Sequence, residues 1–192
     1  MSLLDGILNF NKRFVAEKAY EPFLTNALPN KKLLILTCMD TRLVELLPRA
    51  MDFRNGDVKI IKNAGALVTH PFGSVMRSIL VAVYSLDVHE IAVVGHHDCG
   101  MTGLSCRDIL DKALAAGVSP DTITMLKHAG IELERWLVGF DQVQDGVQQS
   151  VEMIRTHPLL PQKLPVHGLI IHPETGQLDV VVDGYKAAGG AV

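Results

Sequence analysis

The chain has 192 residues, of which 48% are apolar and 20% charged, and its formal net charge is −3. This length supports a substantial core, and we expect residues 1–192 to form a single domain. Lysine and arginine are not clustered, which argues against a nucleic-acid partner, and the longest apolar runs, such as residues 79–84, are too short to cross a bilayer.

The N-terminal residues lack the basic region, long apolar stretch and cleavage site of an export signal, so we expect a cytoplasmic protein with no membrane partner. The sequence contains three cysteines. Such a low, odd number in a cytoplasmic chain favours metal binding or catalysis over disulfides.

The N-terminus predicts an amphipathic helix. Ser2 and Asp5 form a capping-box pattern, and the helix should stop near Pro22. Its apolar stripe consists of Leu4, Ile7, Leu8 and Phe14. Nothing in the neighbouring sequence offers this stripe a partner, so we expect it to dock on a second subunit.

The remaining elements alternate along the chain. Short apolar runs at residues 33–37, 58–61 and 90–94 are typical of buried parallel strands. One helix should begin at a Ser74 cap, and others are expected at residues 107–116, 119 to about 137, and 141–155. We expect Trp136, on the helix from 119 to about 137, to lie in the core. Residues 166–171 and 178–182 predict a hairpin at the sheet edge. This order predicts an α/β fold: a mainly parallel sheet, flanked by helices, with an antiparallel edge strand.

Two motifs rich in metal-binding side chains follow the first and third predicted strands. They are Cys38-Met39-Asp40-Thr41-Arg42 and Gly95-His96-His97-Asp98-Cys99-Gly100. Ligands of open parallel sheets bind beyond the carboxyl ends of the strands, where the strand order reverses. If the two strands are neighbours, the motifs therefore meet in space.

The residue types in these motifs suit zinc. His96 and Cys99 are three positions apart, between two glycines that let the chain turn tightly, and Cys38 supplies a third ligand. Two thiolates and one imidazole suit one Zn²⁺ per chain and leave a fourth position for water, as in catalytic sites. A lone cysteine at a strand end is more often a buried packing residue, so the prediction depends on the joint occurrence of both motifs.

Cys38-x-Asp40-x-Arg42 and Gly95-His96-x-x-Cys99-Gly100 resemble the two signature motifs of the β-class carbonic anhydrases. The turn Asn63-Ala64-Gly65 is also similar to that family. Some members carry Trp and Arg of a regulatory bicarbonate pocket where this chain has Ile35 and Lys62, so the sequence looks closer to the short prokaryotic branch.

The resemblance implies reversible hydration of carbon dioxide to bicarbonate, with zinc on Cys38, His96 and Cys99 and with Asp40 and Arg42 as a catalytic dyad. It also implies a homodimer or an assembly of dimers. We expect Ala64, Gly65 and Gly100 to lie against the substrate.

The charge of the ligand set predicts a pH dependence. Two thiolates cancel the charge of the ion, so the pKa of the bound water should be higher than with neutral ligands. Hydration activity should therefore rise with pH. Asp40 has two possible states, one paired with Arg42 and one bound to the metal itself. His97 and His70 are both candidate proton shuttles.

Three alternatives have different consequences. A carbon disulfide or carbonyl sulfide hydrolase would use the same metal site. A non-catalytic zinc-binding regulatory protein would need neither Asp40 nor Arg42. A thiol redox protein using Cys38 and Cys99 would lack a Cys-x-x-Cys pair and would leave His96 without a role.

Overall fold

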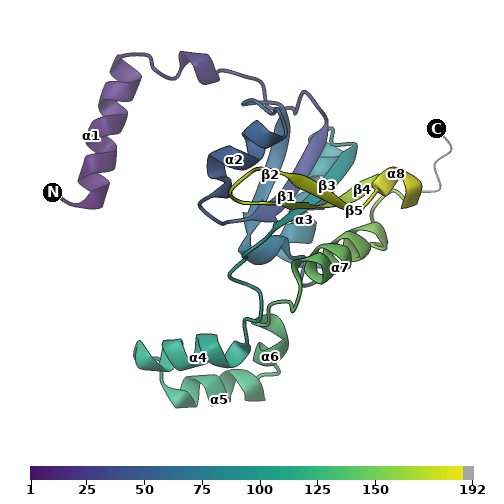
Figure 1. Cartoon of the computed structure of the whole chain (residues 1–192). Helices are drawn as coiled ribbons and strands as arrows, with labels where there is room; N and C mark the ends of the chain where they lie inside the picture. The colour runs from purple at the N-terminus through teal and green to yellow at the C-terminus, as the bar shows by residue number, and fades with distance from the viewer. Residues whose placement is uncertain (188–192) are drawn as a thin grey trace.

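The structure, a computed structural model, describes residues 1–187 and is built around a five-stranded sheet with the order β2-β1-β3-β4-β5 (Figure 1). The strands are β1 (Leu33–Cys38), β2 (Val58–Asn63), β3 (Glu90–His96), β4 (Val166–Ile171) and β5 (Leu178–Val182). The first four are parallel, and β5 pairs antiparallel with β4. The predicted fold class and all five predicted strands are confirmed.

Helices cover both faces of the sheet. The helices are α1 (Leu3–Ala16), α2 (Leu43–Ala50), α3 (Ser74–Ser85), α4 (Cys106–Ala115), α5 (Pro120–His128), α6 (Leu133–Trp136), α7 (Val143–Arg155) and α8 (Gly184–Ala187), with short 3₁₀ turns η1 (Glu21–Phe23) and η2 (Ala64–Ala66). Leu34 and Leu36 of β1 pack on the side of α3 and α7, whereas Ile35 packs on the side of α2. Side chains alternate between the faces of a strand, so a strand buried on both faces is apolar throughout.

Several helix predictions need correction. The segment from residue 119 to about 137 is two helices, α5 and α6, because Gly130 adopts a left-handed φ of +83° just after α5. Trp136 is 64% exposed, so its predicted core position is wrong. Gly73, in extended conformation, occupies the N-cap of α3, and Ser74 is its first residue rather than its cap. Helix α2, which contains Pro48, was not predicted from the sequence.

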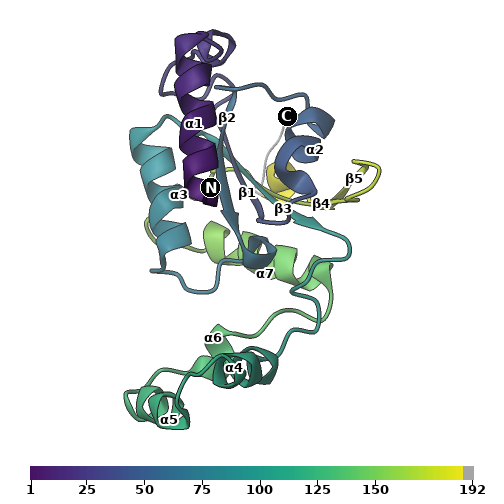
Figure 2. The same cartoon turned by 90° about the vertical axis from the view of Figure 1, so that its left-hand side faces the viewer.

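Two parts of the chain project from the sheet. Figure 1 shows α1 apart from the sheet at the end of a connecting segment, and none of its residues is buried. Ser2 and Asp5 form the predicted capping box, but the predicted end near Pro22 is wrong: the helix ends at Ala16, and Lys18 soon after it has a left-handed φ of +55°. Helices α4, α5 and α6 form an arm below the sheet in both views (Figures 1 and 2). Among residues 1–187, no helix combines the length and the apolar character needed to span a bilayer.

The strand order determines where the two motifs lie. The chain leaves β1 toward β2 on one side and leaves β3 toward β4 on the other, while β1 and β3 themselves are neighbours. Their carboxyl ends therefore flank the switch point of the sheet, where ligands of such folds bind.

Candidate metal centre and active site

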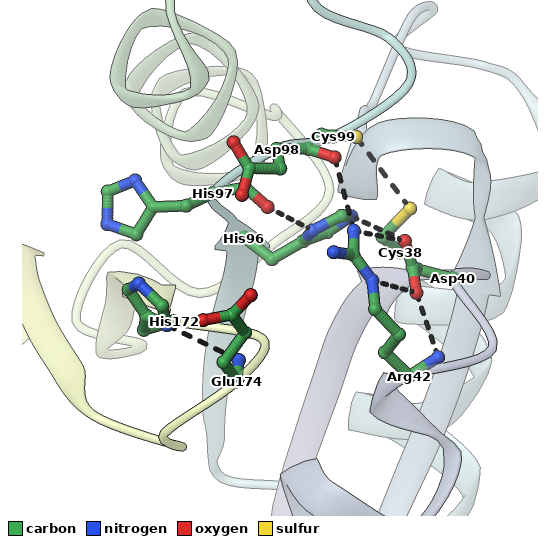
Figure 3. Close-up of polar contacts among 9 residues, drawn as sticks. All are labelled: Cys38, Asp40, Arg42, His96, His97, Asp98, Cys99, His172 and Glu174. Carbon is green, nitrogen blue, oxygen red and sulfur yellow. Dashed lines mark hydrogen bonds and ion pairs between the residues drawn. The ribbon is translucent and has the colours of Figure 1, made fainter.

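Three side chains from the two motifs converge at this switch point (Figure 3). Cys38 ends β1, His96 ends β3, and Cys99 lies in the turn that follows. Their ligand atoms lie within 4.8 Å of one another, and the residues are only 5%, 1% and 6% exposed, respectively. The predicted meeting of Cys38 with His96 and Cys99 in space is therefore observed.

The turn that carries Cys99 is made differently from the expectation. Asp98, rather than a flanking glycine, adopts a left-handed φ of +53°. Gly95 serves helix packing instead, because a Cβ there would lie 2.7 Å from Val147 of α7 and 2.8 Å from Val143. Gly100 has open space around its Cα. The two glycines of the motif therefore do not shape the turn in the way that their spacing suggested.

The imidazole of His96 is oriented toward the two sulfurs. Its Nδ1–H donates to the carbonyl oxygen of His97 at 2.7 Å, which leaves the lone pair on Nε2. Nε2 is buried and finds no hydrogen-bond partner within residues 1–187. A histidine that donates one ring N–H to a carbonyl and leaves the other nitrogen free is the usual arrangement of a metal ligand.

The two thiols form a tightly coupled pair. The Sγ atoms of Cys38 and Cys99 are 3.9 Å apart. Their shared hydrogen bond lowers the pKa of Cys38 to about 4 and raises the pKa of Cys99, so the metal-free pair retains one proton. Burial lowers the pKa of His96, but the Cys38 sulfur and the His97 carbonyl outweigh it, and the net pKa is raised. Two sulfurs and one unpartnered imidazole nitrogen fit Zn²⁺ with an open fourth position.

Asp40 and Arg42 lie at the edge of this group as a bidentate pair. Arg42 Nε donates to Asp40 Oδ1 at 3.0 Å, a terminal guanidinium nitrogen donates to Oδ2 at 2.9 Å, and the Arg42 backbone N–H adds a third bond of 2.8 Å. These bonds lower the pKa of Asp40 to about 2, so the carboxylate is ionised at neutral pH. Asp40 Oδ2 lies 3.8 Å from His96 Nε2. Both carboxylate oxygens accept from the Arg42 side chain, so Asp40 is in the state paired with Arg42.

Arg42 also joins the two motifs. The same guanidinium donates to the backbone carbonyl of Asp98 at 3.2 Å, and the left-handed conformation of Asp98 sets the direction of that carbonyl. The sequence did not predict this contact, because every residue has a backbone carbonyl and residue type does not indicate which one accepts a hydrogen bond.

The three residues predicted to face the substrate have different environments. Gly65 is buried, and its backbone N–H helps to lower the pKa of Cys38. Ala64, which precedes Gly65, and Gly100, which follows Cys99, are both exposed. The wall around the cysteines is apolar and includes Phe140, which sequence analysis did not single out.

The rings of the two candidate proton shuttles contact groups other than the three metal-binding side chains. Figure 3 shows the ring of His97 on the opposite side from His96, beside His172, with ring centroids 5.8 Å apart. His70 accepts a hydrogen bond from the backbone N–H of Phe72. His172 and Glu174 directly follow β4, and the last residue of β4, Ile171, is the register partner of His96. The two residues therefore follow a strand end that neighbours His96. The predicted strand at 166–171 could have indicated this.

Comparisons with known proteins agree with this geometry. The sequence profile of a family described as carbonic anhydrase matches residues 33–178. A Bacillus subtilis protein named "Putative carbonic anhydrase YvdA" is 60% identical over 186 residues, which cover 97% of this chain and 94% of that protein. A carbon disulfide hydrolase of Acidithiobacillus thiooxidans is more distant, with 28% identity over 78% of this chain and 76% of its own.

A solved structure matches the whole fold. The β-carbonic anhydrase isoform I of Trichomonas vaginalis superposes with a TM-score of 0.87 and 36% identity, covering 96% of this chain and 100% of that chain. Both motifs lie within the matched region of the family profile. The chain therefore belongs to the carbonic anhydrase family, in its β class.

Proposed function

We propose that this protein catalyses the reversible hydration of carbon dioxide to bicarbonate and a proton, with one zinc ion held by Cys38, His96 and Cys99. The observation that carries the proposal is the convergence of these three buried ligand atoms beside the ionised Asp40–Arg42 pair. A purely structural zinc site needs no such pair, which argues against a non-catalytic role. A redox role would leave the oriented imidazole of His96 unexplained.

The roles of the residues follow from their geometry. When bound, zinc supplies the Lewis acidity that makes water a nucleophile near neutral pH. Asp40, held by three hydrogen bonds from Arg42, presents a fixed ionised acceptor that orients the attacking water. Arg42 keeps this carboxylate off the metal position and, through the Asp98 carbonyl, keeps the two loops together. The apolar cluster around the cysteines, which includes Phe140, limits access of bulk water.

One preparation tests the proposal directly. Zinc content should approach one ion per chain, and the same sample should hydrate carbon dioxide in a stopped-flow indicator assay. Carbonyl sulfide and carbon disulfide should be tested alongside, because the distant relatives include carbon disulfide hydrolases. Faster turnover of a sulfur substrate would replace the proposed substrate but keep the metal site, and a zinc-free protein with full activity would overturn the site itself.

The affinity for zinc should decrease as the pH is lowered, because protons compete with the metal for the ligands. The raised pKa of Cys99 means that zinc displaces one proton across the neutral range, and below the raised pKa of His96 it displaces two. Cys38 has a pKa of about 4 and contributes no proton near neutrality. We expect the affinity to fall roughly tenfold for each unit by which the pH is lowered in the range where one proton is displaced, and more steeply below the raised pKa of His96.

Competition titrations with a chelator of known proton affinity, at pH 6 to 9, measure this slope. A zinc affinity that is independent of pH over that range would contradict the ligand assignment, because neither raised pKa would then belong to a ligand.

We also propose that the protein is a homodimer or an assembly of dimers in which α1 packs on a partner subunit. The apolar side chains Leu4, Ile7 and Leu8 are all exposed in the single chain. Burying a large apolar side chain contributes roughly 1.5–3 kcal/mol, so this stripe favours a partner surface. The separation of α1 from its own sheet leaves it free to reach one (Figure 1).

Deleting residues 1–20 should therefore disrupt the assembly. Sedimentation velocity should show dimers or larger species for the full chain at low micromolar concentration and a shift toward monomers for the truncated chain. The double variant Leu4→Asp/Ile7→Asp should reproduce the shift, whereas Lys12→Asp, on an exposed polar position of α1, should not. A compact monomer for the full chain would contradict the proposal.

A further inference from the structure

Residues 63–67 lie beside the first metal ligand. Asn63 ends β2 and is the register partner of Cys38 in the parallel pair β1–β2. Its carbonyl oxygen accepts a hydrogen bond from the Met39 backbone N–H at 2.8 Å. The backbone of Asn63 is therefore joined to the strand that carries Cys38 at the point where that strand ends.

The backbone that follows is strained. Gly65 has a φ of +76°, and Ala66 follows with a φ of +58°. Glycine tolerates this left-handed region, but alanine does so at a cost because its Cβ crowds the next carbonyl oxygen. Ala66 is fully buried. Such a conformation persists only when the surrounding contacts enforce it.

The side chain of Asn63 supplies the nearest of those contacts. Its Nδ2 donates to the Leu67 carbonyl oxygen at 2.6 Å, and its Oδ1 accepts from the Leu67 N–H at 3.1 Å. The carboxamide thus closes the loop over Gly65 and Ala66 with two bonds to a single residue. Both bonds are partly buried, so water competes poorly for them.

The closed loop lies beside the metal ligand. Gly65 is buried, and its backbone N–H contributes to the lowered pKa of Cys38. Gly65 is also packed tightly, since a Cβ there would lie 3.0 Å from Met101 and 3.1 Å from Phe140. Groups behind a metal ligand orient it and tune its affinity, and their loss typically costs 10- to 100-fold in affinity or activity.

We propose that Asn63 is a positioning residue for the metal centre: its carboxamide clamps the left-handed Gly65–Ala66 turn and so holds the backbone beside Cys38, to which Asn63 is joined through strand register and the Met39 N–H, in place. The proposal rests on the proposed zinc function, although the clamp itself is a feature of the metal-free chain. Asn63 acts through the loop, because its own carboxamide bonds to Leu67.

The test compares Asn63→Ala with Asn55→Ala, whose side chain also donates to a backbone carbonyl, that of Phe23, on a different loop. In the metal-free protein, hydrogen exchange at the Leu67 amide should accelerate at least about tenfold in Asn63→Ala and remain unchanged in Asn55→Ala. In the loaded protein, zinc release to a chelator should be about 10- to 100-fold faster. The thiolate-to-metal charge-transfer band of the cobalt-substituted protein should shift.

Each result has a separate meaning. Faster exchange at Leu67 with unchanged zinc release and an unchanged cobalt spectrum would make Asn63 merely structural and overturn the proposal, as would unchanged exchange. If Asn63→Ala does not fold, Asn63→Asp replaces it in the test. This variant retains the acceptor for the Leu67 N–H and loses the donor to the Leu67 carbonyl. It should accelerate zinc release by a smaller factor. A wild-type chain that binds no zinc would contradict the proposed function, while exchange at Leu67 would still report the clamp.

Discussion

Replacing Cys38 with serine is expected to remove zinc and hydration activity together. The serine hydroxyl stays protonated near neutral pH and is a poor substitute for a thiolate on Zn²⁺. Structural zinc sites contribute about 10–16 kcal/mol over four ligands, so one ligand is worth roughly 3 kcal/mol, or about a hundredfold in affinity. Elemental analysis after gel filtration against a weak chelator measures the loss, and stopped-flow hydration measures its consequence.

Cys106→Ser provides the matched control. Cys106 is also buried, but it begins α4 in the arm below the sheet and is not among the grouped ligand atoms. Its replacement should leave zinc content and turnover near those of the wild type. Full zinc occupancy and activity in Cys38→Ser would show that the ligand assignment is wrong.

Replacing Asp40 with asparagine should slow the reaction while zinc stays bound, in contrast to Cys38→Ser, which should lose the metal. Asp40 is not one of the three grouped ligands, so the metal should remain. An amide is a neutral, weaker acceptor, and one of its two terminal atoms becomes a donor that faces the Arg42 guanidinium. Groups that orient or transfer protons are typically worth about 10²–10⁴ in rate, and we expect kcat to fall by that factor.

The control is Asp111→Asn, which removes an equal charge from an exposed site on α4, where Asp111 pairs with Arg107 at 3.6 Å. It should retain wild-type turnover. Zinc content, kcat and KM should be measured for both variants in the same buffer. A zinc-loaded Asp40→Asn protein with wild-type kcat would eliminate the proposed role of the carboxylate.

The sequence alone determined the sheet and the identity of the grouped side chains, because both depend on local signals. Continuous apolar runs such as residues 33–37 predict strands buried on both faces, and a motif that directly follows a strand must lie at its carboxyl end. The choice of Cys38, His96 and Cys99 therefore needed only residue types, their spacing and the assumption that two strands are neighbours. Their approach to within 4.8 Å confirmed that assumption.

Only the tertiary structure decided what holds this group in place. The left-handed turn came from Asp98 rather than from a glycine, and Gly95 proved necessary for the approach of α7. The bond from Arg42 to the Asp98 carbonyl and the clamp of Asn63 on Leu67 both use backbone groups, which every residue carries. Backbone acceptors and donors have no signature in residue type, and their direction depends on φ and ψ angles that long-range packing enforces.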